Sequence, residues 1–173
     1  EKERGQRGEV TSGLSPVYAL YKPALILYST LKRGKGINLY RAPRGTQDIL
    51  PKGQVYWRFI EQKAVEICQL YGYERIDSPT FEDTGLFVRS VGEGTDIVEK
   101  EMYTFEDKGG NQITLRPEGT APVCRAYLEH GLHTLPQPVK LYYLASIFRY
   151  ERPQAGRYRE HHQFGYEAIG DDD

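Results

Sequence analysis

The feature that most constrains the fold is a pair of long strand-like runs near the end of the chain, at residues 139–150 and 159–170. The first run is strongly apolar and aromatic, and the second alternates polar with apolar side chains. Only the short segment 151–158, which reads as a loop, separates them. The two runs therefore predict a long β-hairpin.

The rest of the chain supplies helices and further strands. Between residues 54 and 71 the apolar side chains recur at helical spacing, and Gly72 follows as a stop signal. Strands outnumber helices and short turns join several of them, so we expect an α+β fold in which helices flank an antiparallel sheet. The other predicted elements are helices at 84–91 and 117–130 and strands at 73–77, 102–105 and 113–116, with a turn at 107–110.

Residues 1–38 differ from the rest of the chain, because they are rich in glycine, lysine and arginine and hold one apolar stretch at 23–31. That stretch is shorter than the about 20 apolar residues that span a bilayer, and no small-residue cleavage pattern follows it. We therefore predict a disordered leader or upstream segment at 1–38 and one domain at 39–173. The only methionine is Met102, so we expect a fragment, a processed product or an incomplete reading frame.

Charge and cysteine content exclude several classes of protein. The formal net charge is −1, so the chain is not a bulk electrostatic binder of nucleic acid, and any RNA contact needs a local patch. Cys68 and Cys124 lie far apart and outside any Cys/His cluster. They predict two reduced thiols in a cytosolic protein, with a disulfide as the alternative. Nothing has zinc-ligand spacing, so no metal site is expected.

The second strand of the hairpin is predicted to carry one charged face, because alternate side chains of a strand share a face. A glycine in the middle of such a face often marks the close approach of a ligand. The charged face comprises Arg159, His161, Gln163, Gly165 and Glu167, and the opposite face, predicted to enter a core, comprises Phe164, Tyr166 and Ala168.

The charges on this hairpin point to a specific kind of ligand. Guanidinium groups bind phosphate oxygens in a bidentate fork, whereas carboxylates and amides hold an ammonium, an amine or a ring N–H. A site with both suits a phosphate ester together with a zwitterion, and the alternative is a solvated hairpin with mutually neutralising salt bridges. His161 and His162 point to opposite faces, so the pair cannot chelate one metal ion. The groups on this hairpin are the arginines Arg149, Arg152, Arg157 and Arg159, the carboxylates Glu151 and Glu167 and the amide Gln163.

The same residues resemble a known family. The run FRYER at 148–152, followed by GRYR at 156–159, resembles motif 2 of the class II aminoacyl-tRNA synthetases, and HQFGYE at 162–167 is similar to the histidine-specific members. Matches that occur in order along the chain are more specific than one arginine-rich hairpin. The other segments similar to histidyl-tRNA synthetases are APRGTQD at 42–48 (the N-terminal signature), 73–82 with Pro79 (motif 1, the dimer element) and TLRPEGT at 114–120 (the amino-acid-binding segment).

The resemblance implies a partial class II catalytic domain at 39–173 and a role in ATP binding for several residues. Arg149 would hold the α-phosphate and the amino-acid carboxylate, and Glu151 would contact the adenine amino group. Arg157 and Arg159 would hold the β- and γ-phosphates. His161 stands where the family commonly has a phenylalanine that stacks on adenine, and an imidazole can stack there less extensively.

The resemblance also implies a histidine site. Glu118, Thr120 and Gln163 would hold the α-amino group of the substrate. Glu167 would accept a hydrogen bond from the imidazole N–H. A wrong side chain would leave this buried acceptor unpaired, at a cost of about 1–3 kcal/mol.

The activity implied by the resemblance is that of a histidine–tRNA ligase, which makes histidyl-adenylate from histidine and ATP with Mg²⁺ and then charges tRNA(His). Arg152 and Gln154 would contact the tRNA acceptor stem, with a solvent-exposed loop as the alternative. We expect a cytoplasmic homodimer that associates through the motif 1 region and has no membrane partner. Motif 3 and the anticodon-binding domain have no counterpart before Asp173, so the chain alone is expected to be nearly inactive.

A second function is compatible with the same resemblance. A synthetase-like protein without catalytic activity serves as the regulatory subunit of ATP phosphoribosyltransferase and senses histidine. Such a protein does not need an intact ATP-binding site, and the presence of Arg149, Glu151, Arg157 and Arg159 therefore favours the enzyme.

Overall fold

The computed structural model describes residues 40–92 and 94–170. The leader predicted at 1–38 lies outside these ranges. The chain divides into two units, Glu1–Arg41 and Ala42–Asp173, and the second unit carries every element named below. Within the described ranges, no helix has the length and hydropathy needed to cross a bilayer.

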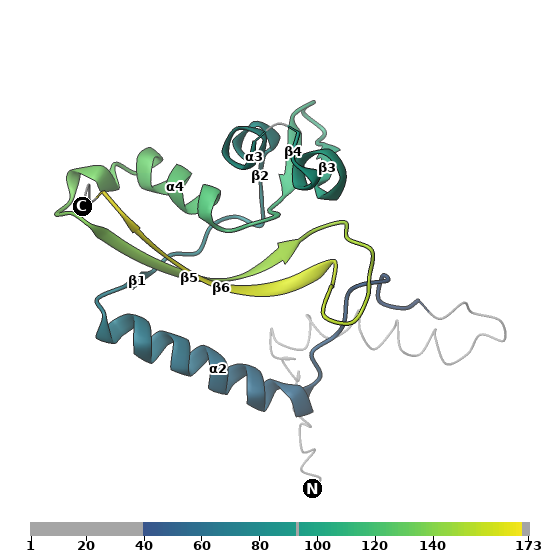
Figure 1. The fold of residues 1–173 in the computed structure, drawn as a ribbon, viewed down its shortest axis with the longest axis horizontal. Coiled ribbons are helices and arrows are strands. Elements are labelled where there is room, and N and C mark those ends of the chain that lie inside the picture. The colour runs from purple at the N-terminus through teal and green to yellow at the C-terminus, as the bar shows by residue number, and fades with distance from the viewer. Residues whose placement is uncertain (1–39, 93, 171–173) are drawn as a thin grey trace, which may run out of the picture. The chain divides into compact units, whose positions relative to one another are not determined.

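A long hairpin organises the first sheet, as the sequence predicts. β5 (Val139–Phe148) and β6 (Glu160–Ile169) pair antiparallel along their whole length. β1 (Glu74–Arg75) pairs with the other side of β5, so the strand order is β1-β5-β6 (Figure 1). The hairpin therefore forms most of this sheet.

A second, smaller sheet consists of β2 (Phe81–Asp83), β4 (Gln112–Leu115) and β3 (Tyr103–Glu106), in the order β2-β4-β3. Both of its pairings are antiparallel. Its central strand places the Thr114 hydroxyl within 2.8 Å of the Thr104 hydroxyl. The two sheets hold the segments that the resemblance assigns to substrate binding.

The α+β class is confirmed, and the structure differs from the expected arrangement in two details. There are two sheets in the described residues instead of one, and β1 runs parallel to β5. A parallel pair needs a long crossover, which the second sheet and the helix after it provide. β2 was missed because the run FED has no alternation of apolar and polar side chains.

The helices agree with the predicted positions. α2 (Pro51–Leu70) begins before the predicted residue 54, because a proline suits the first helical turn. α3 (Thr84–Val91) has the predicted bounds, and α4 (Thr120–Glu129) lies inside the predicted range 117–130. Two short helical segments were not predicted, a π-helical segment at Ile97–Glu101 and a 3₁₀ turn at Leu132–Thr134.

α2 and α4 lie on opposite sides of the hairpin (Figure 1). Only Ala64 and Cys68 of α2 are buried in the described structure. The apolar side chains at helical spacing on α2 are largely exposed to solvent, since Phe59 is 62% exposed and Leu70 is 79% exposed. Cys68 and Cys124 are free cysteines; Cys68 is buried, whereas Cys124 is only partly buried.

The alternation along β6 is confirmed, but the predicted direction of its faces is wrong. Phe164 and Tyr166 are 42% and 64% exposed, whereas Gly165 is buried. The polar face is the inner one because α4 covers that side of the hairpin. The core on this side comprises Val123 of α4 with Leu141, Tyr143, Ala145 and Ile147 of β5.

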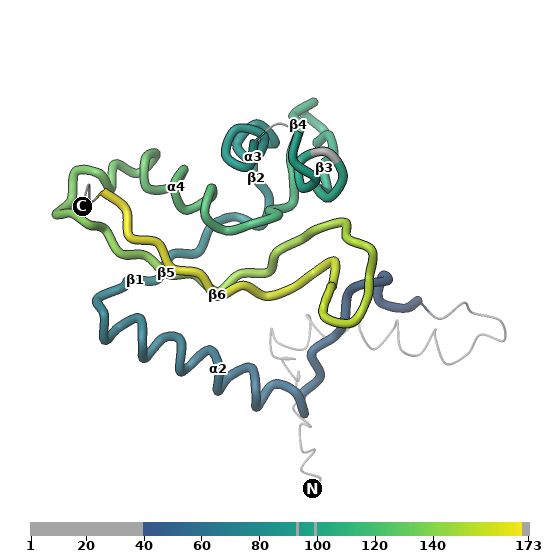
Figure 2. The backbone as a smooth tube through the Cα atoms, viewed as in Figure 1, coloured from purple at the N-terminus to yellow at the C-terminus, as the bar shows by residue number. Residues whose placement is uncertain are grey.

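The segment that leads into α2 runs beside the hairpin loop (Figure 2). The Arg159 backbone N–H donates to the Gly45 carbonyl oxygen at 2.7 Å. Gly45 has a φ of 90°, and a Cβ there would lie 2.8 Å from Cγ of Arg159. Position 45 therefore requires glycine, and the predicted N-terminal signature is joined to the hairpin.

Candidate functional site

Arg149 lies just beyond β5 and is fixed by two contacts. Its Nε donates to the Pro117 carbonyl oxygen at 2.7 Å, and its backbone N–H donates to the Arg159 carbonyl oxygen at 3.0 Å. Its guanidinium lines a cavity of about 470 Å³ that Glu151, Arg157 and His161 also line. The structure thus brings together four of the five residues predicted to bind ATP.

The same cavity has an acidic side. Two acidic residues line the cavity together with the arginines: Asp96, just before the π-helical segment, and Glu101, at the end of that segment. The Tyr150 backbone N–H donates to the Glu101 carbonyl oxygen at 2.7 Å, which holds this segment against the hairpin. Sequence reasoning missed both residues, because nothing in their local pattern indicates that a distant hairpin lies over them.

His161 lines the cavity from β6, opposite Ile147 of β5. Burial lowers the pKa of His161 most, the charge of Arg149 lowers it further, and Glu151 acts in the opposite direction. A neutral imidazole is therefore favoured, and a neutral ring can stack on a flat aromatic ligand. His162 points away from the cavity, with its ring 4.5 Å from that of Trp57.

Arg157 and Arg159, the two other arginines predicted to bind ATP, differ in their surroundings. The Arg157 side chain is 65% exposed, and its Nε lies 3.8 Å from the Glu151 carboxylate, so the contact is weak. Arg159 packs over the Tyr150 ring at 4.0 Å and donates from Nε to the Glu151 carbonyl oxygen at 3.3 Å. Arg157 is thus free to turn toward a ligand, whereas Arg159 lies outside the cavity lining and supports the loop.

A chain of hydrogen bonds joins the residues predicted to hold histidine. The Thr120 hydroxyl donates to the Glu167 carboxylate at 2.7 Å, which connects α4 to β6. The Glu118 carboxylate accepts from the backbone N–H groups of Thr120 and Ala121 at 2.7 and 2.9 Å. A carboxylate at a helix N-terminus is favoured by the helix dipole. Gln163 lies on the same inner face of β6, opposite Ala145.

Tyr143 is a site residue that sequence reasoning missed. It is buried on β5 beneath Thr120 and Glu167, and burial is the main cause that raises the pKa of its hydroxyl. A Cβ at Gly119 or at Gly165 would overlap its ring. The signal that could have found it is its register position directly opposite Gly165.

The two predicted tRNA contacts lie on the hairpin loop. Arg152 and Gln154 are exposed, and neither residue lines the cavity. Gln154 and Arg157 exchange backbone hydrogen bonds at 2.9 and 3.2 Å around a tight turn. The loop is therefore ordered by its own backbone and leaves both side chains open to a partner.

Comparisons with known proteins agree with this geometry. A family profile described as histidyl-tRNA synthetase matches residues 45–173. A histidine–tRNA ligase of Dehalococcoides mccartyi is 73% identical over 135 residues, which cover 78% of this chain and 32% of the ligase. The chain thus spans about a third of the length of this curated relative.

Solved structures give the same result. The structure of apo histidyl-tRNA synthetase from S. aureus is 47% identical with a TM-score of 0.65, and the match covers 78% of this chain and 30% of that one. A Bacillus halodurans structure described as an ATP phosphoribosyltransferase regulatory subunit/histidyl-tRNA synthetase is 30% identical with a TM-score of 0.64, covering 80% and 34%.

Proposed function

Because the chain belongs to the histidyl-tRNA synthetase family, we propose that it carries part of a site in which ATP activates histidine for transfer to tRNA(His). One observation carries the proposal. His161, which lines the cavity with Arg149 and Arg157, lies on the same inner face of β6 as Glu167, which Thr120 contacts, and this supports neighbouring sites for a triphosphate and an amino acid.

The proposed chemistry is adenylate formation. A histidine carboxylate oxygen attacks the α-phosphorus of ATP, a new P–O bond forms, and the bond to the β-phosphate oxygen breaks to release pyrophosphate. Arg149 neutralises charge on the carboxylate and the α-phosphate as they approach, and the Pro117 carbonyl keeps it in place. The activated histidine then passes to the 3′ end of the tRNA.

Four other residues are proposed to hold the nucleotide. Arg157 holds the β- and γ-phosphates through its guanidinium group. Arg159 contributes to the same contact less directly, because it also supports the loop. His161 stacks on adenine as a neutral ring, and Glu151 accepts a hydrogen bond from the adenine amino group. The support is the shared cavity of Glu151, Arg157 and His161 with Arg149.

Selection of histidine is proposed to depend on the inner face of the hairpin. Glu118, Thr120 and Gln163 hold the α-amino group, and Glu167 accepts from the imidazole N–H. The Thr120 hydroxyl already donates to Glu167, which orients the carboxylate before substrate binds. A side chain that lacks an N–H leaves the Glu167 carboxylate with the Thr120 hydroxyl but without a donor from the substrate, which is the proposed physical basis of the selectivity.

Mg²⁺ carried by the ATP phosphates is also part of the proposal. Mg²⁺ prefers oxygen ligands and is held by one or two carboxylates together with substrate phosphates. Asp96, Glu101 and Glu151 line the cavity, but the Asp96 carboxylate accepts from the Lys100 ammonium at 2.8 Å and the described residues hold no cluster of three or more metal-ligating side chains, so the substrate phosphates would supply most of the ligands. When bound, the ion would neutralise phosphate charge, while Arg149 and Arg157 keep the roles given above.

The partners of the complete protein are also part of the proposal. Arg152 and Gln154 on the exposed loop would contact the acceptor stem of tRNA(His). Residues 73–82 would form part of a homodimer interface, and the protein would act in the cytoplasm. The likeness to histidine–tRNA ligases supports all three statements.

A chimeric ligase tests the proposal. In it, the 135 matched residues of this chain replace their counterparts in the D. mccartyi ligase. We expect histidine-dependent ATP–pyrophosphate exchange close to that of the parent, and little exchange by the 173-residue chain alone. Arg149→Ala should lower the exchange by at least about a hundredfold, and Arg89→Ala, on the exposed side of α3, should not. An active chimera that tolerates Arg149→Ala would contradict the proposed site.

The alternative function is that of a regulatory subunit of ATP phosphoribosyltransferase, one of the two functions in the description of the Bacillus halodurans structure. The preserved cavity and the 73% identity to a histidine–tRNA ligase support the enzyme instead. Copurification with a phosphoribosyltransferase, together with failure of the chimera to charge tRNA, would reverse this order.

A further inference from the structure

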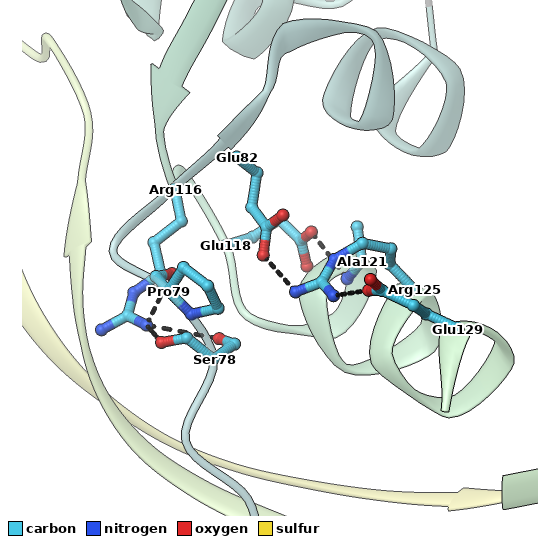
Figure 3. Close-up of polar contacts among 8 residues, drawn as sticks. All are labelled: Ser78, Pro79, Glu82, Arg116, Glu118, Ala121, Arg125 and Glu129. Atoms are coloured by element: carbon cyan, nitrogen blue, oxygen red, sulfur yellow. Dashed lines mark hydrogen bonds and ion pairs between the residues drawn. The ribbon is translucent and has the colours of Figure 1, made fainter. Parts of the chain in front are cut away.

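Arg116 is a buried arginine that none of the roles above uses. It follows β4, is 8% exposed, and donates to main-chain oxygens of two separate segments. Nε donates to the Ser146 carbonyl at 2.8 Å, and Nη1 donates to the carbonyls of Ser78 and Pro79 at 2.8 and 3.2 Å. Figure 3 shows the guanidinium turned toward Ser78 and Pro79.

The backbone of Arg116 joins the same segments. Its N–H donates to the Thr80 carbonyl oxygen, and its carbonyl oxygen accepts from the Phe148 N–H, both at 3.0 Å. Side chain and main chain together tie residues 78–80 and 146–148 to the start of the segment 116–120. Arg116 therefore stands where the two sheets meet.

The charge on Arg116 has no close ionic partner, which argues against a simple stabilising ion pair. In the described part of the chain, no carboxylate lies within ion-pair distance of it, whereas Arg125 pairs with Glu82 at 2.6 Å (Figure 3). Burial lowers the pKa of Arg116, and the more distant Asp77 and Glu82 raise it. A buried cation is costly compared with a well-packed apolar side chain. Its donors, however, reach carbonyls on two segments, which a shorter or apolar side chain cannot do.

We propose that Arg116 is a positioning residue. It fixes the main chain next to Arg149 and the main chain next to Glu118, and so sets the positions of these two side chains. The inference rests on the proposed function. The next residue, Pro117, supplies the carbonyl that holds Arg149 Nε at 2.7 Å. Glu118 follows directly and caps α4. A shift of the Arg116 main chain therefore moves the groups that receive the carboxylate and the amino group of histidine.

The effect should differ between the two substrates. The amino-acid ligands Glu118 and Arg149 lie next to the segments that Arg116 joins. Arg157 lies in the hairpin loop, which is held by its own turn and by the contact of Arg159 with Gly45. Because Arg149 also faces the α-phosphate, loss of Arg116 should weaken histidine binding strongly and ATP binding to a smaller extent, since Arg157 keeps its place.

The experiment compares Arg116→Lys and Arg116→Met with Arg89→Lys in the chimeric ligase. Lysine keeps the charge but cannot reach the carbonyls on both segments, and Arg89 is an exposed arginine on α3. In both Arg116 variants the KM for histidine should rise and kcat should fall, each by about tenfold or more, while the KM for ATP rises by a clearly smaller factor. Arg89→Lys should match the unsubstituted chimera.

The KM values separate positioning from folding, because partial unfolding lowers the active amount and leaves each KM unchanged. Unchanged KM values in Arg116→Lys overturn the inference. If both variants are recovered only as insoluble protein, Arg116 serves folding alone, and the inference is overturned as well. Equal increases in the KM values of histidine and ATP also overturn it. Inactivity of the unsubstituted chimera is a different result and contradicts the proposed function itself.

Discussion

Tyr143 lies directly opposite Gly165 in the register of β5 and β6, and its ring fills the space that a side chain at position 165 would need. Gly119 leaves room for the same ring from the side of α4. One aromatic side chain held between two glycines thus forms the floor of the proposed histidine site.

Gly165→Ala in the chimeric ligase tests this relationship. The new Cβ would overlap the Tyr143 ring, so we expect overpacking to cost about 1–3 kcal/mol of stability. Displacement of the ring toward Glu167 should also lower histidine affinity, as measured by calorimetric titration. Gly53→Ala, on α2, is the matched control, because the nearest atom to its Cβ is a side-chain carbon of Ile49 at 3.7 Å. Histidine binding of normal affinity by Gly165→Ala would contradict the prediction.

Glu167→Gln keeps the size of the side chain and removes the charge that we propose accepts the imidazole N–H. Loss of a hydrogen bond to a charged group should cost about 1.5–3 kcal/mol. We expect the KM for histidine to rise, measured by ATP–pyrophosphate exchange in the chimera, with the KM for ATP unchanged. Glu106→Gln, on the exposed edge of β3, serves as control. An unchanged histidine KM would remove Glu167 from the selectivity argument.

His161 should give stability a pH dependence. Burial and then Arg149 lower the pKa of His161 in the folded chain. The unfolded chain therefore takes up the proton first, and the free energy of unfolding falls as pH drops below about 6.5, the ordinary histidine value. Above that pH the imidazole is neutral in both states and this loss is absent.

Urea unfolding of the chimera between about pH 5 and pH 8 measures this effect. His161→Phe should flatten the acidic part of the profile, and it should keep ATP binding because phenylalanine also stacks on adenine. His130→Gln replaces an exposed histidine at the end of α4 and should leave the profile as it is. Equal profiles for the unsubstituted chimera and His161→Phe would contradict the assignment.

Arg157→Ala should separate binding from stability. Its pair with Glu151 is long at 3.8 Å and the arginine is largely exposed, so the free energy of unfolding should change by less than about 0.5 kcal/mol. The KM for ATP should rise by about tenfold, because one guanidinium contact to the phosphates is lost. Arg58→Ala, exposed on α2, should affect neither quantity. A large loss of stability with a normal ATP KM would assign Arg157 to the loop structure.

Local pattern was enough to predict the longer helices, the hairpin and four of the residues that line the cavity. The runs around Tyr143 and Gln163 gave the hairpin because strand alternation is a property of consecutive residues. Arg149, Glu151, Arg157 and His161 share one cavity as expected, since they flank one hairpin loop.

The burial of a strand face and the contacts between distant segments could not be predicted from local pattern. Which face of β6 is buried depends on where α4 packs, so the outward position of Phe164 was not foreseen. The contact of Arg159 with Tyr150 and the presence of Glu101 in the cavity likewise depend on packing between segments. Tyr143 looked like any apolar strand residue until its register opposite Gly165 was known.

The hydrogen bond between Arg159 and Gly45 has a consequence for the order of folding. It joins the first described segment to the last strand, and β1 likewise waits for β5. Closing such long loops costs chain entropy, and folds rich in distant pairings form slowly. During synthesis on the ribosome, the segment at 42–48 must therefore wait without its partner until β6 has emerged. Nascent chains that pause before residue 160 would have the N-terminal signature but no ATP cavity.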